Sequence, residues 1–97
     1  MAKPIIWSNK AQKERKEILS YWQARNKSKT YSNRLNLLFI FGAEAIAEFP
    51  ESGVRTDVIN VRMKLVKDYY LFYRIEDATI EIISIWDTRR NPEERPF

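Results

Sequence analysis

The chain has 97 residues, 44% of them hydrophobic, and a formal net charge of +4 at pH 7, which suits one folded domain over residues 1–97 and excludes a disordered tail. It contains neither cysteine nor histidine. Disulfides, thiolate or histidine-ligated metal sites and any nucleophile activated by histidine are therefore excluded, and we expect neither a metal nor a cofactor.

The N-terminal quarter predicts a short strand followed by a helix. The strand, Ile5-Ile6-Trp7, comes after Pro4, and proline is tolerated at the start of an edge strand. Ser8 can cap a helix because its hydroxyl accepts a hydrogen bond from a backbone N–H two or three residues later. Helical spacing of apolar residues predicts a first helix from about Asn9 to Arg25, with a buried stripe of Ala11, Ile18, Leu19 and Trp22.

A polar connection at residues 26–29 leads to a second helix, which Ser28 or Thr30 can cap. Its apolar residues keep the helical period but cover more than one stripe, so this should be the better buried helix. Gly42 inside it costs about 1 kcal/mol relative to alanine, which close approach to a neighbouring element would explain. Pro50 forces the residue before it out of helical geometry and ends the helix.

The C-terminal half predicts strands. Alternation from Val61 to Leu65 and from Tyr69 to Ile75 indicates two of them, and the polar pair Lys67-Asp68 between them predicts a hairpin turn. Residues 54–60 fit either a loop or a ragged edge strand. The isoleucine-rich residues 80–86 predict an interior strand, apolar on both faces.

The alternation along the last strand and the order of the elements give the expected fold. In the last strand, Ile80 and Ile82 should lie on one face and Ile83 and Ile85 on the other, because side chains alternate along a strand. The order of strand, two helices and strands joined by tight turns predicts an α+β fold, with a helical hairpin packed on one face of a small antiparallel sheet (βααβββ).

Charge is distributed unevenly along the chain. Residues 1–34 carry nine Lys or Arg and two Asp or Glu, whereas residues 35–97 carry eight and eleven. The basic part suits a polyanion or an acidic protein, and the alternative is a pair of solvated helix faces. We find no export segment, and the longest apolar run, Leu37–Ala43, is too short to span a bilayer. We therefore expect a cytoplasmic protein with no membrane partner.

Four segments of the sequence carry a resemblance to a known family. They are Trp7-Ser8 before a helix with Ala11, Phe49-Pro50 with a glycine soon after, residues 68–75 (DYYLFYRI) and residues 82–92 (IISIWDTRRNP). Together they resemble the RelE/ParE toxins of bacterial type II toxin–antitoxin systems, over almost the whole chain. The resemblance implies a growth-inhibiting toxin of the kind involved in plasmid stabilisation. It also implies a cognate antitoxin as partner, which wraps the toxin and masks its active surface.

The RelE/ParE family contains two mechanisms. RelE-like members are mRNA interferases, ribosome-dependent endoribonucleases that cleave mRNA in the ribosomal A site. ParE-like members share the fold but poison DNA gyrase without cleaving RNA. We slightly favour mRNA cleavage, with ribosome and mRNA as partners. The alternatives are a non-enzymatic gyrase poison and a non-toxic binding domain of the same fold.

The resemblance and the strand-end cluster together predict a site for RNA cleavage. Arginine suits this role because its planar guanidinium binds two phosphate oxygens at once. The expected catalytic residues are Arg89, Arg90, Arg74, Tyr70 and Asp87. The expected RNA-binding residues are Arg62 and Lys64, which would contact phosphates, and Trp86, which would stack on a base or serve only in packing. This hypothesis requires the rim of the sheet to gather Arg62, Lys64, Arg74 and Arg89 or Arg90 into one anion-binding patch.

Two positions depart from the RelE-like pattern. Tyr70 stands at or next to a position that often holds arginine, and Asp87 is closest to one that often holds histidine. An exposed aspartate has a pKa of about 4 and is a weak base at pH 7 unless its surroundings raise that value. Any cleavage would therefore depend on the ribosome to orient the ribose 2′-hydroxyl.

Overall fold

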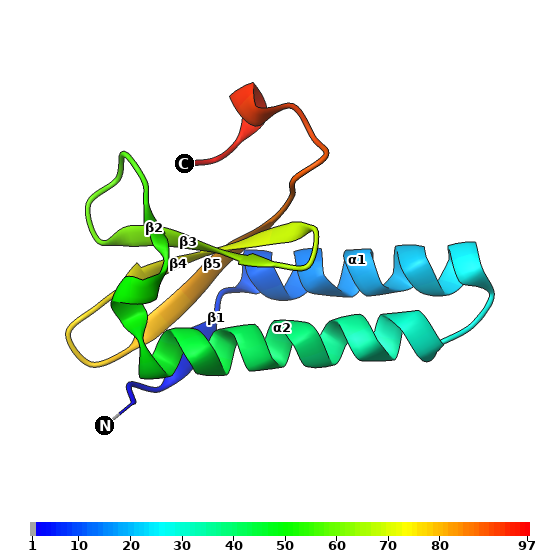
Figure 1. Ribbon diagram of the computed structural model, residues 1–97, viewed down its shortest axis with the longest axis horizontal. Helices are drawn as coiled ribbons and strands as arrows, with labels where there is room; N and C mark the ends of the chain where they lie inside the picture. The colour runs from blue at the N-terminus through cyan, green and yellow to red at the C-terminus, as the bar shows by residue number, and fades with distance from the viewer. Residues whose placement is uncertain (1) are drawn as a thin grey trace.

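The computed structural model describes residues 2–97, and the elements follow the predicted order. They are β1 (Ile5–Trp7), α1 (Asn9–Asn26), α2 (Thr30–Glu48), β2 (Val54–Arg55), β3 (Val61–Val66), β4 (Tyr69–Ile75) and β5 (Ile80–Asp87), with short 3-10 helices at Pro50–Ser52 and Pro92–Glu94. The helices run side by side along one face of the sheet, and their connection projects beyond it (Figure 1). No helix in the described part of the chain has the length and apolar character needed to cross a bilayer.

The five strands form one sheet in the order β1-β5-β4-β3-β2. The prediction of a helical hairpin packed on one face of a small sheet is confirmed, and the pairs β2–β3, β3–β4 and β4–β5 are antiparallel as expected. The sheet is mixed, because β1 pairs parallel with β5, with Ile5 opposite Ile80 and Trp7 opposite Ile82. A long connection separates these two strands in sequence, and long connections permit parallel pairing.

The ends of the helices follow from local sequence. Ser8 caps α1, since its Oγ accepts a hydrogen bond from the backbone N of Ala11 at 3.0 Å. The N-cap of α2 is Lys29, so the prediction of Ser28 or Thr30 at that position is wrong, although Ser28 Oγ does accept from the backbone N of Thr30 at 3.2 Å. The second helix ends at Glu48, two residues before Pro50, as predicted.

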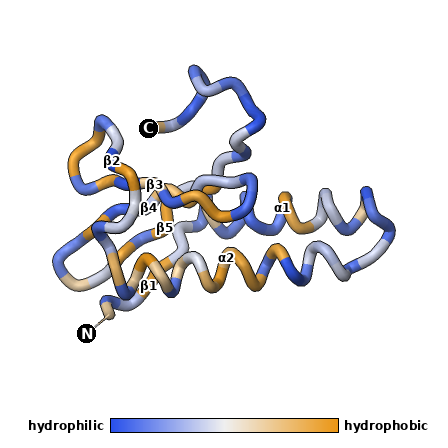
Figure 2. The backbone as a smooth tube through the Cα atoms, viewed as in Figure 1, coloured by the Kyte–Doolittle hydropathy of each residue, from blue (hydrophilic) through white to orange (hydrophobic). Residues whose placement is uncertain are grey.

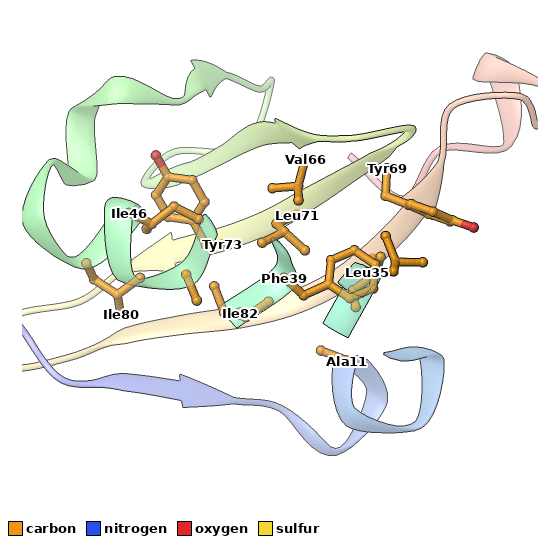
Figure 3. Packing of buried hydrophobic residues seen from close by; sticks show 12 residues of the cluster. Ala11, Leu35, Phe39, Ile46, Val66, Tyr69, Leu71, Tyr73, Ile80 and Ile82 are labelled. Carbon is orange, nitrogen blue, oxygen red and sulfur yellow. The ribbon is translucent and has the colours of Figure 1, made fainter. Parts of the chain in front are cut away.

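The main core lies between α2 and the sheet. Leu35 and Phe39 from α2 are fully buried against Leu71 and Tyr73 from β4 and Ile80 and Ile82 from β5 (Figure 3). A Cβ atom on Gly42 would lie 2.6 Å from Cγ2 of Val66. The predicted close approach at this glycine is therefore confirmed, and it sets the distance between α2 and β3.

A β-bulge changes the faces of β5. Phe72 lies opposite Ser84 while Tyr73 lies opposite Ile82, so Ile83 has no partner on β4. Ile85 therefore joins Ile80 and Ile82 in the core beneath the helices, and Ile83 packs on the other face. The prediction that Ile83 and Ile85 share a face is wrong, because one extra residue shifts the alternation of every residue after it.

Two connections in the sheet lie at the positions that the sequence indicated. The predicted turn at Lys67-Asp68 joins β3 to β4, and Lys67 has a left-handed backbone with φ of 57°. Residues 54–60, which fitted either a loop or an edge strand, form the two-residue strand β2 and then a loop that ends at Asn60, whose φ is 65°.

The sheet face away from the helices carries a smaller aromatic cluster. Val61, Phe72, Ile83 and Trp86 are buried there, with Phe97 from the C-terminal segment packed against them. The rings of Phe72 and Phe97 are 5.2 Å apart, and Arg95 donates to the sulfur of Met63 at 3.8 Å. The last residues of the chain, which show no periodic pattern, therefore cover this face.

Candidate functional site

The end of β5 holds a fixed pair of opposite charges. Arg89 donates from Nε to one carboxylate oxygen of Asp87 at 2.9 Å and from Nη2 to the other at 2.8 Å, and its backbone N donates to the same carboxylate at 2.9 Å. These hydrogen bonds lower the pKa of Asp87 and raise that of Arg89. Asp87 is thus a fully ionised carboxylate that orients Arg89, which is the opposite of what a general base at neutral pH requires.

Trp22 of α1 and Tyr69 of β4 support this pair. The guanidinium carbon of Arg89 lies 5.6 Å from the centre of the Trp22 ring, within the range of a cation–π contact. Trp22 Nε1 in turn donates to the hydroxyl of Tyr69 at 2.8 Å, and burial raises the pKa of that hydroxyl. Arg89 is therefore fixed from two directions, by α1 and by β5.

Arg90 points to the other side of the strand end. Its guanidinium carbon lies 4.2 Å from the centre of the Trp86 ring, and its Nη2 is 3.8 Å from a carboxylate oxygen of Glu94. The side chain is 57% exposed, so the ion pair is weak and Arg90 can still contact a partner. Trp86 is only 5% exposed and packs with Phe72 and Ile83, so little of its ring is open to a base.

Tyr70 lies beside this second cluster. It is opposite Trp86 on the neighbouring strand, and opposite residues of an antiparallel pair share a face. Its ring is 6.3 Å from that of Phe72. The structure therefore brings Tyr70, Trp86 and Arg90 together on the face away from the helices, with Asp87 and Arg89 next to them at the same end of the sheet.

The other cations predicted for the site lie elsewhere. Arg74 is five residues beyond Tyr69 on β4, about 17 Å away along the strand, and its Nη1 is 3.6 Å from a carboxylate oxygen of Glu81. Its partner on β3 is Val61, so it lies on the face away from the helices. Arg74 is thus on the same face as Tyr70 but at the opposite end of the sheet.

Arg62 and Lys64 lie on the helix side of the sheet. Arg62 is opposite Tyr73 and Lys64 is opposite Leu71, both of which belong to the core beneath the helices. The Nη1 of Arg62 also donates to the carbonyl oxygens of Gly53 at 2.9 Å and Glu51 at 3.2 Å. The expected patch of Arg62, Lys64, Arg74 and Arg89 or Arg90 does not form, because the hairpin register sends the first two to the opposite face.

A groove of 510 Å³ runs between α1 and the end of β5. Both apolar and charged residues line it: Glu14, Glu17, Ile18, Tyr21, Tyr69, Ile85, Asp87, Arg89 and Arg90. Glu14 accepts hydrogen bonds from the hydroxyl of Ser84 and the backbone N of Ile85, both at 3.1 Å, and so closes the edge of β5 beyond the end of β1. The groove therefore has Glu14 and Glu17 on its α1 wall, and Asp87, Arg89 and Arg90 on its wall at the end of β5.

Sequence reasoning did not single out Glu14 or assign Trp22 a role in the site. Glu14 has a signal in the sequence, since it follows Ala11 by three residues and precedes Ile18 by four, on the buried side of the predicted helix. Trp22 was expected only in the apolar stripe, and its contact with Arg89 depends on how α1 crosses β5. No group of acidic residues within residues 2–97 is arranged to hold a metal ion.

The family model described as the ParE toxin of type II toxin–antitoxin system, parDE, matches residues 5–92. Among solved structures, the chromosomal ParDE toxin–antitoxin system from P. aeruginosa contains a similar chain, with a TM-score of 0.77 and 13% identity over 91% of this chain and 98% of that chain. The E. coli DinJ-YafQ toxin–antitoxin complex gives a TM-score of 0.50 and 14% identity over 90% and 93%. No curated protein sequence matches significantly. At these identities the structural likenesses show a common fold.

Proposed function

Because the chain belongs to the ParE toxin family of type II toxin–antitoxin systems, we propose that it arrests growth by binding DNA gyrase and that it does not cleave RNA. The observation that carries this proposal is the dispersal of the cleavage residues. Arg62 and Lys64 lie on one face of the sheet, and Tyr70 and Arg74 lie on the other. The mRNA interferase activity that the sequence slightly favoured is therefore the second candidate.

The chemistry of cleavage supports the same proposal. Attack by the ribose 2′-hydroxyl needs a base to take its proton and cations around the phosphorane. The carboxylate paired with Arg89 is Asp87, whose pKa is lowered by its hydrogen bonds with this arginine. The chain contains no histidine that could replace it. A toxin that binds its target without bond cleavage needs none of these groups.

We further propose that Arg90 and the groove beside it form part of the surface that recognises the target. Arg90 is exposed at the mouth of the groove, and Arg89 is held rigid beside it by Asp87. Both guanidinium groups are exposed and can each bind two oxygens of a partner carboxylate. Two arginines at one strand end also suit an acidic partner segment.

The proposed regulator is a cognate antitoxin. Both structural relatives were solved as toxin–antitoxin systems or complexes, which supports a protein partner of this kind for the present chain. A gyrase-binding toxin held by an antitoxin would act in the cytoplasm, where gyrase works on the chromosome.

Expression of the chain without an antitoxin tests the proposal. We expect growth arrest with DNA breaks and induction of the SOS response, and we expect mRNA to remain uncut within codons. Mapping of mRNA 5′ ends and an SOS reporter give both readouts from one culture. Intra-codon mRNA cuts without DNA breaks would establish the interferase activity instead, and continued growth with the folded chain present would favour a non-toxic binding domain.

Substitutions at the strand end test the recognition surface. Arg89→Ala with Arg90→Ala should abolish growth arrest and leave the fold intact, as circular dichroism can verify. The matched control is Lys3→Ala with Arg55→Ala, which removes two cations nearer the opposite end of β4, since Lys3 contacts Glu76 and Arg55 is opposite Arg62. Arrest by the folded strand-end variant, or equal loss of arrest in the control, would reject Arg89 and Arg90 as the recognition residues.

A further inference from the structure

The helical hairpin carries a long stretch without any acidic residue. Between Glu17 and Glu44 the sequence contains no Asp or Glu, while Arg25, Lys27, Lys29 and Arg34 fall within it. All four of these side chains belong to exposed residues, and none forms a salt bridge with another described residue. The positive charge of this end of the molecule is therefore not neutralised from within.

A row of cationic and neutral polar side chains along α1 leads to this end of the molecule. Lys13, Lys16, Ser20 and Gln23 follow one another at intervals of three or four residues, which puts them on one side of the helix, and Lys27 follows at its C-cap. All five are exposed, and the row is about 21 Å long at the rise of an α-helix. At its end, a hollow of 410 Å³ is lined by Ser20, Gln23, Ala24, Lys27, Ser28 and Lys29. Figure 2 shows how hydrophilic this projecting end of the hairpin is.

The composition of the row favours a nucleic acid over a protein. Protein interfaces have an apolar centre and are depleted in lysine, whereas residues 23–30 are all exposed and include no large apolar side chain. Lysine, serine, threonine and amide side chains are the groups that contact phosphate oxygens. The surface therefore has the chemistry of backbone contact without an apolar anchor.

The same residues distinguish a duplex from a single strand. Proteins that hold single strands provide aromatic side chains for stacking of unpaired bases, and the row contains none. A duplex presents a dense and regular array of phosphates, which matches a straight row of cations on a rigid helix.

We propose that the outer side of α1, from Lys13 to Lys27, together with Lys29, binds the sugar–phosphate backbone of duplex DNA without sequence preference. This site is separate from the groove at the end of β5, which Arg89 and Arg90 line. It goes beyond the proposed action on gyrase, since binding to DNA alone can be measured whether or not gyrase is the target.

The test measures binding of the full chain to a fluorescent 30-base-pair DNA duplex of arbitrary sequence between 50 and 300 mM NaCl. The test variant is Lys13→Gln/Lys16→Gln/Lys27→Gln. The matched control is Lys3→Gln/Arg55→Gln/Lys67→Gln, which removes the same charge. Each triple includes one lysine in the left-handed backbone conformation, Lys27 or Lys67, so any conformational cost is matched as well.

We expect the test variant to bind at least tenfold more weakly at 100 mM NaCl. The negative slope of log K against log salt should become shallower by about 2 to 3, because each lost phosphate contact removes about 0.9 from its magnitude. The control should retain at least half of the parent affinity and an unchanged slope. Equal weakening of both triples would show that only net charge matters and overturn the proposal. Tighter binding of a polyglutamate peptide than of the duplex would overturn it in favour of an acidic protein partner.

Discussion

The two faces of the sheet are built in different ways. The face beneath the helices has a continuous core, with Phe39 of α2 and Tyr73 of β4 among its fully buried residues. The other face has a small aromatic cluster around Phe72, covered by the C-terminal segment through Phe97 and Arg95. Packing on the helix side should therefore contribute most of the folding stability, and the other face should tolerate substitutions better.

This difference also separates the candidate residues. Arg62 and Lys64 lie on the helix side, while Tyr70, Arg74 and Trp86 lie on the side that the tail covers. A catalytic centre made from both sets would have to reach through the sheet. The fold instead offers a strand end at which Arg89 is fixed to Asp87 and Arg90 remains exposed.

The largest effect should come from a cavity in the main core. Phe39→Ala removes a fully buried ring and should lower the free energy of unfolding by about 3 to 5 kcal/mol. Urea unfolding followed by circular dichroism measures this loss. A loss below about 1 kcal/mol would show that the helix side does not dominate stability, since core truncations normally cost more than that.

A smaller loss is expected from overpacking between α2 and β3. In Gly42→Ala the new Cβ would lie 2.6 Å from Cγ2 of Val66 and should cost about 1 to 3 kcal/mol of unfolding free energy. Adding Val66→Ala removes the clashing methyl group, so the double variant should be less destabilised than the sum of the single ones. Strict additivity, measured by the same urea method, would mean that the two residues do not meet.

On the other face, Phe97→Ala should have a modest effect. The ring is partly buried against Phe72, so its loss should cost about 1 kcal/mol, since full burial of such a ring contributes about 1.5 to 3. Thermal unfolding of Phe97→Ala and Phe39→Ala under the same conditions compares how much the two faces contribute to stability. Equal destabilisation by the two variants would contradict the difference between the faces.

The smallest effect concerns pH. Hydrogen bonds with Arg89 lower the pKa of Asp87 in the folded state, so its ionisation stabilises the fold above the unfolded pKa of about 4. That stability is lost as pH falls through the folded pKa. Because Arg89 is exposed, Asp87→Asn should lower the free energy of unfolding at pH 7 by less than about 1 kcal/mol. The free energy of unfolding of this variant should also decrease less than that of the parent as pH falls. Denaturant titrations at pH 7 and pH 3 measure both effects. The control is Asp77→Asn, at an exposed turn, which should change neither the free energy of unfolding at pH 7 nor its loss in acid.

Local signals in the sequence predicted much of the fold. Ser8 before the first helix, Gly42 inside the second and Lys67-Asp68 between two strands each carry a physical requirement that can be recognised without coordinates. The bulge at Ile83 could not be predicted, because an isoleucine within an isoleucine-rich strand shows no sign of an unpaired position.

The candidate site was predicted less well, for two different reasons. A two-residue turn at Lys67-Asp68 already implies that Lys64 pairs with Leu71, so the opposite faces of Lys64 and Arg74 could have been derived from sequence. The support of Arg89 by Trp22 could not, since those residues are far apart in the chain and meet only through the packing of α1 on β5.

Action on gyrase without cleavage of RNA is the central proposal for this chain. One reaction pair tests it: the purified chain incubated with gyrase and supercoiled plasmid, and the same preparation incubated with ribosomes programmed with mRNA. We predict gyrase-dependent plasmid cleavage and intact mRNA, and we expect Arg89→Ala with Arg90→Ala to abolish the plasmid cleavage. Cut mRNA beside intact plasmid would contradict the account.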